Sequence, residues 1–184
     1  MPLLRLVLSA VFMIAGLIPK SEFVVVRGEK VRVQANTSIG SINCTYSSAG
    51  KRDTLFLNKA ILKQDRLSIA IPVKKFSCGN ILLNKDFQHT LNAQNHPFVQ
   101  VDVLELNKHK NTITGTLLLM LAGKSKVLKD VSFYVITNSK AQTLATDLCL
   151  SFTDFELATP KKMGGMVKVD DDLQISVELQ LCAE

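Results

Sequence analysis

Apolar and polar residues alternate along most of the chain. In the segment 173–181 every second residue is apolar, namely Leu173, Ile175, Val177, Leu179 and Leu181. The residues between them are polar, namely Gln174, Ser176, Glu178 and Gln180. A period of two places all the apolar side chains on one face of a β-strand. The pattern therefore predicts antiparallel strands with one buried face and one solvated face.

Roughly eight or nine segments are expected to be strands, most of them with this alternation, at the even spacing of a β-sandwich or β-barrel. They are 23–26, 31–35, 41–46, 67–73, 99–103, 113–121, 131–135, 148–152 and 173–181. No internal repeat, low-complexity tract or linker divides the series. We therefore expect a single all-β domain, and a chain of 184 residues is long enough to bury a substantial core.

One segment interrupts the strands with a helical pattern. Asn84 has the side chain of a helix N-cap, and Phe87 and Leu91 are spaced to share one face of a helix. Pro97 cannot continue a helix and forces its predecessor into an extended conformation, so the next strand starts there. The pattern predicts a short helix at about 84–93 that covers one end of a barrel.

The N-terminal segment has the composition of a signal peptide. Arg5 is followed by an apolar run at 6–18, which ends at Pro19. This run is shorter than the roughly 20 residues that a membrane-spanning helix needs. We therefore predict a signal peptide at 1–18, a mature domain at 21–184, and a periplasmic or secreted protein. A membrane anchor or a buried first helix is the alternative.

Export gives the four cysteines the chance to form disulfides. Cys44, Cys78, Cys149 and Cys182 allow three pairings, and their spacing lacks the paired cysteines of a zinc site. The alternation places Cys149 and Cys182 on outward faces. A closing hairpin without a bulge around Gly164 and Gly165 would bring these two nearly opposite each other. A cross-strand disulfide and two free thiols are both open at this point.

Charge and composition exclude several classes of function. The net charge is +6, and the lysines gather where loops are expected, which suits either anionic headgroups or simply solvated strand ends. Few aromatic residues and no tryptophan argue against a nucleic-acid partner. The chain lacks the short motifs of hydrolases, metalloproteases and nucleotide-binding enzymes. We therefore expect no catalysis, no metal and no cofactor other than a bound lipid.

Four segments together resemble the YceI-like, polyisoprenoid-binding family. They are NTSIGSINCTY, CGNILLNKDFQHTLNAQNHPFVQV, GTLLLMLAGKSKVLKDVSFYV and LCLSFTDFELATPKKMGGMVKVDDDLQISVELQL, and they follow the family's order over nearly the whole mature chain. One departure is that the R-D-x-H-L run of many members is replaced by Leu82-Leu83-Asn84-Lys85-Asp86-Phe87. This departure concerns the mouth of the barrel and the choice of ligand, not the fold.

The resemblance implies a lipocalin-like antiparallel β-barrel of eight strands that is exported and holds a polyisoprenoid or fatty-acid-like chain. Its cysteine-containing branch implies a Cys44–Cys78 disulfide. Inward Val, Leu, Ile and Phe side chains without a buried charge suit a hydrocarbon, since burying each methylene is worth about 0.8 kcal/mol. The residues expected to contact the chain, or else to pack as core, are Phe87, Leu91, Val101, Leu117, Leu119, Phe133, Val135, Leu150, Phe152 and Val177.

The alternation is also compatible with two functions other than carrying a lipid. An outer-membrane barrel would face its apolar residues outward, and the polar outward residues of 173–181 speak against it. A structural or protein-interaction β-domain with a filled core and a basic surface is the remaining alternative. Transient contact with a membrane surface and a homodimer are both compatible with the sequence.

Overall fold

The computed structural model describes residues 22–57, 66–110, 112–138, 141–162 and 167–182. The predicted signal peptide at 1–18 lies outside the described residues. The elements in chain order are β1 (Glu22–Thr37), β2 (Gly40–Leu57), β3 (Ser68–Pro72), η3 (Val73–Lys75), α2 (Ile81–Thr90), β4 (Phe98–His109), β5 (Thr112–Leu121), β6 (Lys124–Asn138), β7 (Ala141–Ser151), η4 (Thr153–Phe155), β8 (Lys161–Lys162) and β9 (Val167–Leu181). Within these ranges, no helix is both long and apolar enough to cross a membrane.

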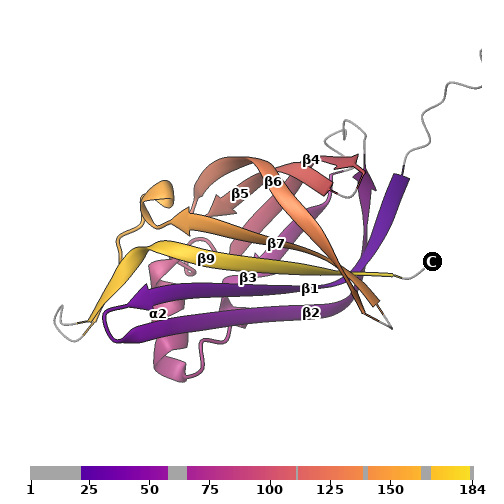
Figure 1. Cartoon of the computed structure of the whole chain (residues 1–184). Coiled ribbons are helices and arrows are strands. Elements are labelled where there is room, and N and C mark those ends of the chain that lie inside the picture. The colour runs from indigo at the N-terminus through magenta and orange to yellow at the C-terminus, as the bar shows by residue number, and fades with distance from the viewer. Residues whose placement is uncertain (1–21, 58–65, 111, 139–140, 163–166, 183–184) are drawn as a thin grey trace, which may run out of the picture.

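Eight strands form one antiparallel sheet that curls into a half-barrel (Figure 1). Their order is β2-β1-β9-β7-β6-β5-β4-β3, and the short β8 pairs only with β9. The all-β prediction is therefore confirmed, including the strand count. The predicted segments 23–26 and 31–35 turn out to be one strand, β1, with an irregularity between Val26 and Gly28. A Cβ on Gly28 would lie 2.9 Å from the Ser48 carbonyl oxygen, so glycine permits the close approach of β2.

The sheet has one open seam, between its edge strands β2 and β3. In the described part of the chain, no ladder joins these two strands. The segment after η3 crosses the seam instead, where Thr45 and Ser77 exchange two backbone hydrogen bonds of 2.9 Å. The adjacent Cys44–Cys78 disulfide joins the same two segments, with its Cα atoms 4.0 Å apart. The predicted pairing is confirmed, and the disulfide holds together the seam that the sheet leaves open.

The helix α2 begins three residues earlier than the sequence indicated. Asn80, not Asn84, is its N-cap, because the Asn80 side chain accepts a hydrogen bond from the Leu83 N–H at 2.9 Å. The prediction of Asn84 as the cap was wrong. The Asn84 side chain lies one turn inside the helix and accepts from the Cys78 N–H at 2.7 Å. Gly79, at a φ of 94°, forms the turn directly before the helix N-cap, and glycine adopts this positive φ without strain.

Cys149 and Cys182 do not lie opposite each other. Cys149 is exposed and pairs with Gln174 across the β7–β9 ladder, whereas Cys182 lies just beyond the end of β9. Both are free thiols, so the cross-strand disulfide is ruled out. The start of β9 pairs with β8 and not with β7. The turn η4 and the residues after it lie between β7 and β8, and they shift the register on which the expectation depended.

The core side chains line the inside of the half-barrel and continue to the end where α2 and η4 lie. A second group of buried side chains packs at this end, namely Val73, Leu91, Ala93, Leu119, Leu121, Leu150 and Phe155. Phe155 of η4 is 2% exposed, which makes it one of the most deeply buried large side chains. Helical segments therefore cover one end of the sheet, as the sequence predicted for its short helix.

Candidate ligand-binding cavity

A cavity of about 180 Å³ lies inside the half-barrel. All eight strands of the sheet contribute inward side chains to its wall, and α2 contributes Leu83, Asp86, Phe87 and Thr90. The only polar side chains in the wall, among the described residues, are those of Glu29, Asp86, Thr90 and Thr146. A largely apolar wall of this kind matches a hydrocarbon better than a polar molecule.

Nine of the ten residues that the sequence singled out line this cavity. They are Phe87, Leu91, Val101, Leu117, Leu119, Phe133, Leu150, Phe152 and Val177. The period of two explains the six that lie on strands, because a single inward residue fixes the parity of its whole strand. Phe87 and Leu91 share one face of the helical segment because they are four residues apart.

Val135 is the exception. It has the parity of Phe133, but it is 49% exposed and is not part of the cavity wall. The β5–β6 ladder ends at the pair Ile113 and Phe133, so β6 continues past the edge of its neighbour. Val135 pairs with the buried Leu144 of β7, but no β5 residue pairs with it on its other side, so its inward parity does not bury it.

The inner face also holds a carboxylate that was not among the predicted wall residues. Glu29 lies two residues before Val31 on β1, and it lines the cavity. The expectation of an interior without a charged group was therefore wrong. Extending the alternation of Val31 and Val33 back by two residues would have found it. Thr146 is the other inward polar residue of the strands, and its hydroxyl donates to the Ser132 carbonyl at 2.9 Å.

A row of aromatic rings connects the seam to the helix. The Tyr46 ring lies 5.7 Å from that of Phe76, and Phe76 lies 5.0 Å from Phe87 of α2. Tilted rings at these distances attract each other beyond the burial of their surface. The row fixes α2 against the disulfide-linked seam, so Phe87 faces the cavity from a position held by its neighbours.

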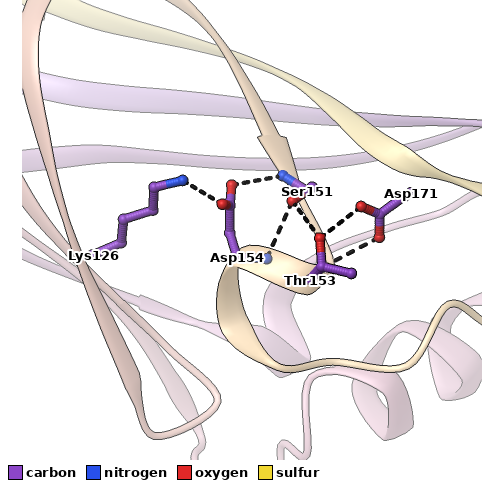
Figure 2. Close-up of polar contacts among 5 residues, drawn as sticks. All are labelled: Lys126, Ser151, Thr153, Asp154 and Asp171. Carbon is purple, nitrogen blue, oxygen red and sulfur yellow. Dashed lines mark hydrogen bonds and ion pairs between the residues drawn. The ribbon is translucent and has the colours of Figure 1, made fainter.

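A polar network at the end of β7 holds η4 in place (Figure 2). Asp154 accepts from the Ser151 N–H at 3.0 Å, and its own N–H donates to the Ser151 hydroxyl at 3.1 Å. Lys126 of β6 forms an ion pair with Asp154, and the Thr153 hydroxyl donates to Asp171 at 2.8 Å. The hydrogen bond from Lys126, together with that from the Ser151 backbone, holds the pKa of the Asp154 carboxyl below its usual value.

This network acts on the cavity through the two phenylalanines beside it. Phe152 lines the cavity, and Phe155 packs in the end group of the core. The polar contacts thus lie on the outside of a turn whose apolar side chains close the barrel. Among the described residues, no three His, Cys, Asp or Glu side chains are close enough together to hold a metal ion.

The sequence and the fold both resemble those of YceI-like domains. The family model for the YceI-like domain matches residues 19–181. The fold is similar to the crystal structure of BcnA from Burkholderia cenocepacia, with a TM-score of 0.55 and 18% identity over 83% of this chain and 95% of the other. The fold is also similar to a polyisoprenoid binding domain from Saccharophagus degradans that is implicated in plant cell wall breakdown. The TM-score is 0.59 and the sequence identity is 11%, over 88% of this chain and 98% of the other. For the YceI protein of Campylobacter jejuni, the TM-score is 0.53 and the sequence identity is 17%, over 65% of this chain and 73% of the other. No curated protein sequence matches the chain.

Proposed function

The chain belongs to the family of YceI-like domains, and we propose that it is an exported carrier that holds a long apolar chain inside its half-barrel. The ligand class is a polyisoprenoid or a fatty-acid-like chain, and the protein binds it without catalysing a reaction. The observation that carries the proposal is the apolar cavity of about 180 Å³, to which every strand of the sheet contributes. The cavity also favours a carrier over a structural β-domain with a filled core. The polyisoprenoid-binding domain of similar fold supports the same ligand class.

The apolar wall can supply the binding energy without polar specificity. Ten methylenes moved from water into such a wall gain about 8 kcal/mol, at about 0.8 kcal/mol each. This gain opposes the loss of translational and rotational freedom, which costs on the order of 4–15 kcal/mol. A chain clearly longer than ten carbons is therefore needed for tight binding, which favours long isoprenoids and fatty chains over small apolar molecules.

The proposed compartment is the periplasm or the outside of the cell. The Cys44–Cys78 disulfide is consistent with an oxidising environment. Both half-cystines are buried, with 4% of each exposed.

Loading from a membrane surface is part of this proposal. Ile81 and Leu82, at the first turn of α2, are 75% and 68% exposed. Lys85 follows them on the same helix, and Lys74 and Lys75 of η3 lie on an element in contact with α2. Exposed apolar side chains beside lysines match the interface of an anionic bilayer, into which the apolar residues insert while the lysines meet the headgroups.

The direct test is mass analysis of the lipid that co-purifies with the exported protein, combined with a variant that blocks the cavity. Val177→Phe adds bulk to the wall, whereas Gln174→Phe adds the same group to the exposed face of the same strand. We expect a co-purified long-chain lipid in the unmodified protein and in Gln174→Phe, and its loss in Val177→Phe. Protein that carries no lipid, and takes up none after delipidation, would contradict the carrier.

A further inference from the structure

The inward carboxylate of Glu29 stands in an otherwise apolar part of the cavity wall. Glu29 pairs across the β1–β9 ladder with Leu179, which is buried on the inner face. The next residue, Lys30, points outward and forms an ion pair of 3.6 Å with Glu178. Two acids at the same level of the sheet thus lie on opposite faces, and only Glu178 has a lysine partner among the described residues.

Tyr46 is the partner of Glu29 inside the barrel. Its phenol donates a hydrogen bond of 3.2 Å to Glu29 Oε1, and its ring is buried against Phe76. This is the one hydrogen bond that the structure gives the Glu29 side chain within the described part of the chain. A carboxylate has room for about four hydrogen bonds. Glu29 therefore retains the capacity to accept a hydrogen bond from a molecule in the cavity.

The charge of the wall decides which molecules can use this capacity. No lysine, arginine or histidine belongs to the described wall of the cavity, whose two acids are Glu29 and Asp86 of α2. A phosphate or carboxylate near Glu29 would meet a like charge in apolar surroundings, where water screens the repulsion poorly. A hydroxyl is neutral and can donate to Glu29, so its burial is compensated by a hydrogen bond to a charged acceptor.

We propose that Glu29 and Tyr46 form the end-group site of the cavity. This site selects apolar chains that end in a neutral hydrogen-bond donor, such as an alcohol, over chains that end in a carboxylate or phosphate. The proposal rests on the carrier function above and names the class of end group that the carrier accepts.

The test compares three ligands with the same hydrocarbon chain: geranylgeraniol, geranylgeranoic acid and geranylgeranyl monophosphate. Their affinities are measured by displacement of a fluorescent apolar dye from delipidated protein. We expect the alcohol to bind about tenfold or more tightly than either anion. Glu29→Gln removes the charge and should bring the acid to within about threefold of the alcohol. Glu178→Gln is the matched control, since it removes the same charge from the outer face, and it should leave the ratio unchanged.

The ratio of two ligands on one protein separates this proposal from a loss of stability. A variant that is merely less stable binds both ligands more weakly to the same extent, so the ratio of the two affinities does not change. Equal affinities for alcohol and acid in the unmodified protein, or an unchanged ratio in Glu29→Gln, would overturn the end-group site and leave the carrier standing. If neither the dye nor any of the three ligands binds, the carrier function itself is overturned.

Discussion

Removing the Cys44–Cys78 disulfide tests how the open seam is held closed. The double variant Cys44→Ala, Cys78→Ala takes away a covalent link between residues separated by 34 positions in the sequence. The chain-entropy model gives about 4 kcal/mol for a link of this span. That is a large part of the roughly 5–15 kcal/mol by which a domain is usually stable. We therefore expect the urea midpoint of unfolding to fall by a large fraction of its value.

The seam also predicts where the loss appears locally. Without the disulfide, the reciprocal hydrogen bonds of Thr45 and Ser77 are the backbone bridge between β2 and the segment that follows η3. Their amides should then exchange with solvent much faster than amides at the centre of the β1–β9 ladder, such as Val33. The assay is residue-resolved hydrogen exchange on the oxidised protein and the variant. Cys149→Ala, Cys182→Ala is the control, because both of these thiols are free.

The result that would refute this reasoning has two parts. An unchanged urea midpoint in Cys44→Ala, Cys78→Ala would show that the disulfide does not stabilise the fold. Exchange at Thr45 and Ser77 as slow as in the oxidised protein would show that the seam stays closed without the covalent link.

Three further predictions concern the ends of the barrel. Phe155→Ala should cost about 3–5 kcal/mol of unfolding free energy, measured in urea, because this ring is 2% exposed in the group that closes one end; a cost below about 1 kcal/mol would contradict that packing. The pKa of Asp154 is lowered from 3.8, so its contribution to stability is present above that value and is lost as pH falls through its folded pKa. Urea midpoints measured from about pH 5 to about pH 2 should therefore fall less in Asp154→Asn than in the unmodified protein, and parallel curves would contradict the assignment. Replacing Ile81 and Leu82 by Asp should reduce the co-sedimentation of the protein with anionic vesicles, whereas Ile136→Asp, on a strand end away from α2, should not; equal binding of both variants would contradict docking through α2.

The alternation of the sequence could predict the strands and the faces of their residues, since a period of two relates every residue of a strand to the next. That is why six expected wall residues on the strands line the cavity, namely Val101, Leu117, Leu119, Phe133, Leu150 and Val177. The same rule, followed back past Val31, would have found Glu29 as well. The rule fails where a strand outruns its neighbour, because Val135 keeps its parity but has no β5 residue beside it.

Register and helix ends were harder to predict from the sequence. The sequence left both a Cys149–Cys182 disulfide and two free thiols open, because no local signal reveals that η4 and the residues after it lie between β7 and β9. Asn80 and Asn84 can both cap a helix, and the choice depends on Gly79 and on the hydrogen bond from Cys78 to Asn84, which is a tertiary contact. The open seam could not be predicted from the sequence either, because alternation identifies strands but not which edges pair.

The central claim is that an apolar chain lies inside the half-barrel, and contacts between ligand and wall measure this most directly. The experiment records intermolecular nuclear Overhauser effects between geranylgeraniol and the methyl groups of protein labelled at leucine, isoleucine and valine. We expect contacts to inward methyls from several strands, such as Val101, Leu119 and Val177. Contacts confined to the exposed Ile81 and Leu82, with no inward methyl involved, would contradict it.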